Sequence, residues 1–198
     1  MAAETEIKIR ISSKDQLAAL LTRCNRLYGP GNESFQRDEY FDTKDELLKA
    51  KDFTVRLRIV DGTAKIALKG PRNFFEDKIH SRLELEFSAN DREAREEIAR
   101  QQLIPTTIIE KRRWEFARRD LNIAVDTLPF IGSFLEVEAS NSARIKKVLR
   151  VLEIDSSWAV TENYTELLEK RLVELGLPVR PNLSATFQEE HIFSPKDA

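Results

Sequence analysis

The amino-acid sequence predicts an α+β domain built on a largely antiparallel sheet. Two observations favour this class. About eight short runs alternate between charged and aliphatic residues, as strands with one polar and one apolar face do. Four other segments place their apolar residues at helical spacing. The length of 198 residues suits one domain, and a hydrophobic content of 41% is enough for a core.

The first alternating run shows the strand pattern most clearly. Glu4, Glu6 and Lys8 share one parity, whereas Ile7 and Ile9 take the other. Successive side chains of a strand point to opposite faces, so this run has one ionic and one aliphatic face. The remaining runs span residues 35–42, 54–60, 63–69, 81–88, 112–118, 121–126 and 133–139.

Four segments predict amphipathic helices. The first begins at Ser13, whose spacing to Gln16 is a capping-box pattern, and the second begins near Asn90 and Glu93. We expect these helices to cover the apolar faces of the strands. Their apolar positions are Leu17, Leu20 and Leu21 in the first, Ala94 and Ile98 in the second, Ile145, Val148, Leu149 and Leu152 in the third, and Tyr164, Leu167, Leu168, Leu172 and Leu175 in the fourth.

The domain is expected to span residues 1–176. Gly176 and Pro178 end the fourth helical pattern, and residues 177–198 are polar and punctuated by proline. We expect this C-terminal tail to be loosely ordered or to fold over one mouth of the domain.

Composition and charge exclude several classes of protein. Charged residues make up 33% of the chain but nearly cancel to a net charge of -2, so the basic excess of a nucleic-acid-binding protein is missing. Cys24 is the only cysteine, which rules out an intrachain disulfide and a cysteine-based zinc site. Neither a signal peptide nor an apolar run of membrane-spanning length is found, so we expect no membrane association and a cytoplasmic location.

The ionic faces of the strands carry almost only Asp, Glu, Lys and Arg, grouped by sign. Glu136 lies two residues from Glu138, and Arg56 two residues from Arg58. A sheet with one solvated face is the simpler alternative. However, like charges about 7 Å apart on one face reduce stability unless an opposite charge lies between them. Paired carboxylates suit Mg²⁺ or Mn²⁺, and grouped Arg and Lys suit phosphate oxygens. The pattern therefore indicates a site for a polyphosphate bound as its metal complex.

The order of the charged motifs resembles that of the CYTH superfamily, the triphosphate tunnel metalloenzymes, which include class IV adenylate cyclases and thiamine triphosphatases. Two further fragments, residues 36–42 and 163–168, are similar to the same family, and the resemblance covers residues 4–175. The ordered motifs are Glu4-Thr5-Glu6-Ile7-Lys8, Arg56-Leu57-Arg58, Lys69-Gly70-Pro71, Arg82-Leu83-Glu84-Leu85-Glu86, Lys111-Arg112-Arg113, Asp126 and Glu136-Val137-Glu138.

The resemblance implies an eight-stranded antiparallel β-barrel that forms a triphosphate tunnel, with the helices packed outside. It places the family's metal ligands at Glu4, Glu6, Asp126, Glu136 and Glu138. It places the triphosphate contacts at Lys8, Arg56, Arg58, Lys69, Arg82, Lys111 and Arg113, with Lys65, Glu84 and His80 as additional candidates. No residue is assigned as a catalytic base.

The expected function is that of a metal-dependent enzyme acting on a small-molecule triphosphate. In the leading hypothesis, a class IV adenylate cyclase-like reaction converts ATP to cyclic AMP and pyrophosphate. The main alternative is a phosphohydrolase of inorganic tripolyphosphate or thiamine triphosphate. A non-catalytic module that binds polyphosphate or nucleotides is a further alternative, and a triphosphatase acting on RNA ends is more remote.

Overall fold

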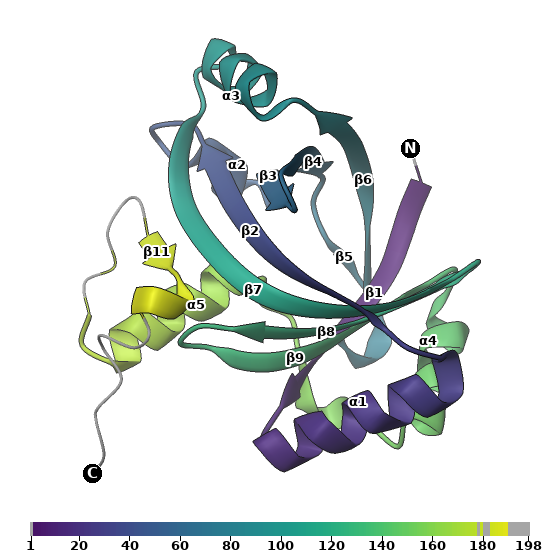
Figure 1. The fold of residues 1–198 in the computed structure, drawn as a ribbon. Helices are drawn as coiled ribbons and strands as arrows, with labels where there is room; N and C mark the ends of the chain where they lie inside the picture. The colour runs from purple at the N-terminus through teal and green to yellow at the C-terminus, as the bar shows by residue number, and fades with distance from the viewer. Residues whose placement is uncertain (1, 178, 180–182, 190–198) are drawn as a thin grey trace.

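Eight antiparallel strands close into a barrel in the computed structural model, which describes residues 2–177, 179 and 183–189 (Figure 1). The order around the wall is β1-β9-β8-β7-β2-β3-β4-β6, and β6 pairs back with β1 to close the ring. The predicted fold class is therefore confirmed. These strands are β1 (Ala2–Ile11), β2 (Asn32–Asp42), β3 (Thr54–Val60), β4 (Thr63–Lys69), β6 (His80–Ala89), β7 (Ile104–Arg118), β8 (Leu121–Leu128) and β9 (Gly132–Ala139).

Three short strands extend this wall. Two of them, β5 (Asn73–Phe74) and β10 (Ala159–Val160), pair with β6 and β1 respectively. The third, β11 (Leu183–Ala185), lies parallel to β7. The predicted boundary of the domain at residue 176 and the predicted tail stay predictions, since residues 178, 180–182 and 190–198 lie outside the described part of the chain.

One predicted strand covers only the second half of the observed strand β7. The alternation favoured residues 112–118, whereas β7 begins at Ile104. The first half of β7 pairs with β2, and the register shifts between Tyr40 and Phe41, next to Pro105. Proline cannot donate to a sheet ladder, so it is tolerated where the pairing is irregular. Pairing with a neighbouring strand, which local alternation does not show, extends β7.

Helices lie outside the barrel, where they were predicted: α1 (Lys14–Tyr28), α3 (Asp91–Arg100), α4 (Ser142–Val151) and α5 (Tyr164–Glu174) (Figure 1). A short helix, α2 (Leu47–Ala50), and two 3-10 turns, η1 (Glu76–Lys78) and η2 (Ser156–Trp158), were not predicted. None of the helices in the described ranges combines the length and the apolar character needed to cross a membrane.

Side-chain caps define the starts of these helices. Ser13 Oγ accepts from the backbone N–H of Gln16 at 3.1 Å, as the capping-box pattern predicted. The reciprocal bond is displaced by one residue, because Gln16 Oε1 accepts from the N–H of Ser12 at 2.7 Å. At α5 both bonds of the capping box form between Asn163 and Glu166. This cap fixes the first turn of α5 against the barrel.

The hydrophobic core lies between the outer face of the barrel and the helices, in three clusters. The largest joins α1 and α4 to β1, β8 and β9, with Ile7, Ile123 and Val137 each at most 1% exposed. A second lies under α5 and β11, and a third under α3. The barrel interior is thereby left to the polar side chains of each strand.

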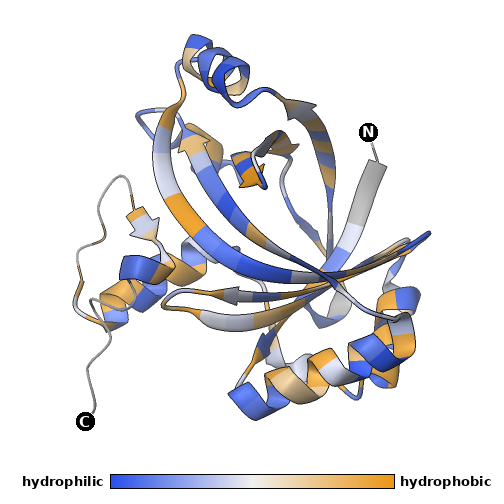
Figure 2. Cartoon of the chain, in the orientation of Figure 1, coloured by the Kyte–Doolittle hydropathy of each residue, from blue (hydrophilic) through white to orange (hydrophobic). Residues whose placement is uncertain are grey.

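The strand β6 shows this division of faces directly. Leu83, Leu85 and Phe87 point outward and remain 53%, 45% and 43% exposed. Arg82 and Glu84, on the other parity, line the interior. Figure 2 shows hydrophobic and hydrophilic residues alternating along this strand. The predicted ionic faces are therefore interior faces and not a solvated side of an open sheet.

We predict that Asn163→Ala lowers the free energy of unfolding by about 1 kcal/mol, because it removes the side-chain oxygen that accepts from the backbone N–H of Glu166 at 2.9 Å. Urea unfolding measures this change. Asn163→Asp keeps a side-chain acceptor and should unfold close to the wild type. An unchanged urea midpoint in Asn163→Ala would contradict the assigned role of the cap.

Candidate active site

A cavity of about 490 Å³ runs through the barrel interior and is lined by side chains from the strands of the wall and from the start of α5. Most of the residues that the sequence singled out face it. The cavity lining includes Glu6, Lys8, Arg56, Arg58, Lys65, Lys69, Arg82, Glu84, Lys111, Arg113, Glu136 and Glu138. Residues separated by up to 132 positions in the sequence thus form one charged surface.

Like charges stand directly opposite each other on two walls of this cavity. Glu6 of β1 is paired in register with Glu138 of β9. Arg58 of β3 is paired with Lys65 of β4. Around the barrel, β6 separates the β1–β9 pair from the β3–β4 pair on one side, and β8, β7 and β2 separate them on the other. Opposed like charges destabilise a sheet unless opposite charges lie near them. Arg58 is paired with Asp38 and Lys65 with Glu86, whereas Glu138 faces Glu6.

The acidic wall carries more negative charge than its neighbours neutralise. Burial raises the pKa of Glu138 to about 7, and the carboxylates of Glu6, Glu84 and Glu136 add to this effect. Glu6 has a partner, because His80 Nε2 lies 2.8 Å from its Oε1. Burial opposes ionisation of Glu6 as well, but the hydrogen bond from His80 and the charge of Lys69 bring its pKa down to about 2.

The basic wall is only partly neutralised by acidic side chains. Lys65 Nζ lies 3.0 Å from a carboxylate oxygen of Glu86, and Arg56 Nη2 lies 3.4 Å from the other. Within the described residues, the buried Nε groups of Arg56 and Arg82 have no hydrogen-bond acceptor. Burial lowers the pKa of Arg82 despite the nearby carboxylates of Glu6 and Glu84. Unsatisfied buried donors of this kind are matched by an anionic ligand.

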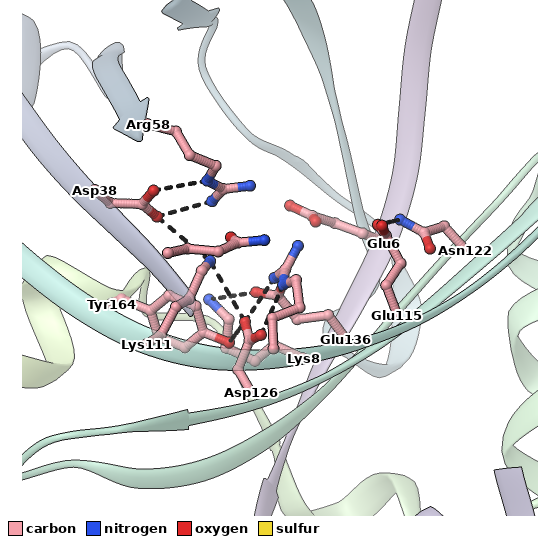
Figure 3. A network of polar contacts seen from close by, with 12 residues as sticks. Glu6, Lys8, Asp38, Arg58, Lys111, Glu115, Asn122, Asp126, Glu136 and Tyr164 are labelled. Carbon is pink, nitrogen blue, oxygen red and sulfur yellow. Dashed lines mark hydrogen bonds and ion pairs between the residues drawn. The ribbon is translucent and has the colours of Figure 1, made fainter. Parts of the chain in front are cut away.

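Between the two walls, buried aspartates hold three cationic side chains (Figure 3). Asp38 receives Arg58 at 2.6 and 2.8 Å, and Asp126 receives Arg113 at 2.7 and 2.6 Å. Lys111 lies between the aspartates, 3.4 Å from Asp38 and 3.5 Å from Asp126. Burial and the two arginines lower the pKa of Lys111 to about 7, although both aspartates counteract this shift.

The first turn of α5 contributes side chains to the cavity next to the buried cluster. The hydroxyl of Tyr164 donates to Asp126 Oδ2 at 2.9 Å. Its ring lies 4.1 Å from Lys8 Nζ, within the range of a cation–π contact. Asn163 and Thr165 also line the cavity. The capping box that fixes this turn therefore also fixes part of the site.

Two of the predicted site residues, Asp126 and His80, are not among the described residues that line this cavity. Asp126 is fully buried behind Arg113, and both of its oxygens accept hydrogen bonds. His80 lies beside Glu6 and packs against Phe74, with ring centroids 5.3 Å apart. The side chain of Glu4 lies outside the described residues, and its backbone pairs in register with Arg82.

Several site residues were missed by sequence reasoning. Asp38, Tyr40 and Gln36 come from the interior face of β2, Tyr164 from α5, and Asn122 from β8. The fragments 36–42 and 163–168 resembled the family, which was the available signal for β2 and α5. Parity did not reveal Asp38 because Arg37 and Glu39 make the outer face of β2 equally polar.

The chemistry of the acidic wall fits a hard divalent cation. Its donors are carboxylate oxygens, the ligands that Mg²⁺ and Mn²⁺ prefer. Burial, together with the carboxylates of Glu6, Glu84 and Glu136, raises the pKa of Glu138 to about 7. In the arrangement described, no three His, Cys, Asp or Glu side chains of the described residues already converge on one point. Glu136 instead bonds Arg113 at 2.6 Å and lies 3.6 Å from Lys8.

Comparison with known proteins gives a consistent result. The model of the CYTH domain matches residues 2–157. A protein of Methanocaldococcus jannaschii, provisionally named an adenylate cyclase, is 28% identical over 177 residues, which is 83% of this chain and 97% of that protein.

Solved structures share the fold. A protein of Vibrio parahaemolyticus, provisionally described as an adenylate cyclase, superposes with a TM-score of 0.69 at 18% identity, covering 83% of this chain and 97% of its own. A Hippeastrum protein described as an adenylyl cyclase with a dominant triphosphatase activity gives a TM-score of 0.64 at 16% identity, covering 90% and 99%.

We predict that ionisation of Glu138 lowers the free energy of unfolding of the metal-free protein, so that its effect depends on pH. Its pKa is about 7 when folded and near 4.5 when unfolded, so the folded state binds the proton more tightly. The contribution of Glu138 to the free energy of unfolding therefore falls as pH rises from 4.5 to 7. Urea unfolding with chelator should show Glu138→Gln gaining stability relative to the wild type across this window.

Glu136→Gln is the matched control, because the pKa of Glu136 is held below its usual value by Arg113, Lys8 and Lys111 despite burial. Glu136 stays ionised across the same window, so its substitution should add no pH-dependent gain. A relative stability of Glu138→Gln that does not change with pH would contradict the crowding of carboxylates on the acidic wall.

Proposed function

This chain belongs to the CYTH family, whose members process triphosphates with divalent cations, and we propose that it binds and processes a linear triphosphate inside the barrel. The observation that carries the proposal is a cavity in which Glu6 faces Glu138, while the buried Nε groups of Arg56 and Arg82 lack acceptors among the described residues. A metal–triphosphate complex presents a cation to one wall and phosphate oxygens to the other. It thereby satisfies both.

The phosphate contacts come from the basic side chains that line the cavity. Arg56 and Arg82 have donors that lack acceptors, and Lys69 and Lys8 approach from neighbouring strands. Arg58, Arg113 and Lys111 complete this set from the buried cluster. Such groups hold the phosphates in line and neutralise the charge that develops on the leaving group.

The proposed ligands of Mg²⁺ or Mn²⁺ are Glu6, Glu136 and Glu138, together with Glu4 of the same strand. When bound, the metal supplies charge neutralisation and polarisation of phosphate oxygens. Asp126 is proposed to keep Arg113 in position and to extend the acidic set, since its carboxylate already bonds Arg113 and Tyr164. His80 is proposed to orient Glu6 through their 2.8 Å contact.

The proposed reaction is that of a class IV adenylate cyclase-like enzyme, in which the ribose hydroxyl of ATP attacks the α-phosphorus and pyrophosphate leaves. The support is the archaeal relative named for this activity, which aligns over 97% of its length. The second candidate is hydrolysis of tripolyphosphate or thiamine triphosphate, with water attacking the terminal phosphorus. It is supported by the description of the Hippeastrum protein.

Product analysis separates these reactions. Incubation with ATP, tripolyphosphate and thiamine triphosphate, each with Mg²⁺ or Mn²⁺, should yield cyclic AMP and pyrophosphate from ATP. Rapid phosphate release from tripolyphosphate without cyclic AMP would select the hydrolase. Glu136→Gln, which removes a charge of the acidic wall, should abolish metal-dependent turnover in either case while leaving the circular dichroism spectrum unchanged. Tight binding without turnover with every metal would favour a binding module.

We predict that Arg82→Met weakens tripolyphosphate binding by about tenfold or more and raises the free energy of unfolding. Arg82 is 8% exposed and its burial lowers its pKa, so its charge costs stability until a ligand compensates it. Titration calorimetry and urea unfolding measure the two quantities. Arg112→Met is the control, because the Arg112 side chain is 57% exposed on the outer face. A loss of stability in Arg82→Met would contradict this assignment.

A further inference from the structure

Asp38 is a buried carboxylate of the barrel interior to which the proposed function gives no role. It is 1% exposed on β2. Its two oxygens accept from Nε and Nη2 of Arg58 at 2.6 and 2.8 Å, and Lys111 Nζ lies 3.4 Å from Oδ2. Burial alone would raise the pKa of Asp38, yet Arg58 and Lys111 hold it well below its usual value. The carboxylate is therefore a permanent anion beside two proposed phosphate contacts.

The geometry of the pair determines which part of Arg58 remains available. A guanidinium has two edges that can form parallel hydrogen bonds with a carboxylate. Asp38 takes the Nε–Nη2 edge and leaves Nη1 outside the pair, directed away from Asp38 (Figure 3). Arg113 uses the same edge on Asp126. Both arginines of the buried cluster are thus held on an aspartate by the Nε–Nη2 edge, and Nη2 of Arg113 also donates to Glu136 at 2.6 Å.

We propose that Asp38 is a positioning residue for the triphosphate: it fixes Arg58 by one edge so that Nη1 faces the phosphates, and it shares Lys111 with Asp126. This inference rests on the proposed function, since it assumes that the cavity binds a triphosphate. An arginine already held by a buried carboxylate loses little further side-chain entropy when a ligand binds. The Arg58 side chain, held in one orientation, also stays near one phosphate group and does not turn toward another.

Positioning and simple charge balance predict opposite signs for a neutral substitution. If Asp38 mattered only as a negative charge in the cavity, Asp38→Asn would make the interior more positive and tighten triphosphate binding. If Asp38 positions Arg58, the amide nitrogen of Asn faces a guanidinium donor, the two-bond pair is lost, and binding weakens. The direction of the change in Kd therefore distinguishes the two roles.

Glu39 provides a matched control on the same strand. It is also buried, at 6% exposure, and is paired with two arginines, Arg37 at 3.1 Å and Arg95 at 2.7 Å. Its side chain points to the outer face of β2, away from the cavity. Glu39→Gln removes a buried ionic partner and tests the effect of lost stability alone.

The experiment measures Kd for tripolyphosphate by titration calorimetry, with and without Mg²⁺, together with thermal unfolding. The proteins are the full-length wild type, Asp38→Asn, Glu39→Gln, Arg58→Ala and the double variant Asp38→Asn/Arg58→Ala. Asp38→Asn should raise Kd about tenfold, whereas Glu39→Gln should lower Tm with Kd within about twofold of wild type. In the Arg58→Ala background, Asp38→Asn should change Kd by less than about threefold, since its main target is gone.

Each outcome decides between the alternatives. Equal or tighter binding by Asp38→Asn, or a weakening of equal size in the Arg58→Ala background, overturns the positioning role while leaving the proposed function in place. Absence of binding by the wild type overturns the proposed function and this inference with it. If Asp38→Asn does not fold, the double variant, which removes both members of the buried pair, is compared with Arg58→Ala, and a large difference between their Kd values overturns the proposal.

Discussion

The structure depends on the neutralisation of charges that the barrel encloses. Lys111 is only 2% exposed, and it lies between two aspartates that each also hold an arginine. A buried charge without a partner costs several kcal/mol, so these five side chains are stable only as a set. The strands that supply them are β2, β3, β7 and β8. Their register must be kept, because a slip of one residue would turn each charge outward.

This constraint also explains the unusual place of the hydrophobic core. Because charged side chains occupy the interior, apolar residues can be buried only between the outer face of the barrel and the helices. The helices α1, α3, α4 and α5 are therefore part of the barrel's stability. The first turn of α5 adds to the site as well, since Tyr164 lines the cavity and donates to Asp126.

Stability and ligand binding oppose each other at the two walls. Where aspartates pair with arginines, the charges are satisfied without a ligand. At Glu6 and Glu138, like charges face each other across neighbouring strands, and the buried Nε groups of Arg56 and Arg82 lack acceptors among the described residues. Burial raises the pKa of Glu138, with the carboxylates of Glu6 and Glu84 adding to the effect, and burial lowers the pKa of Arg82. Incompletely neutralised side chains of this kind break the local rules of stability, as functional sites commonly do.

The sequence by itself predicted most strands of the barrel, the four long helices and the sign of each charge. Alternation located most of the barrel, and motif order indicated the family, because parity and spacing are local properties of the chain. Closure of β6 on β1, and the opposition of acidic and basic walls, were decided by tertiary structure, since both depend on pairing between distant segments. The role of Asp38 was hidden for the same reason. Its partners Arg58 and Lys111 lie 20 and 73 residues away, and both faces of its strand are polar.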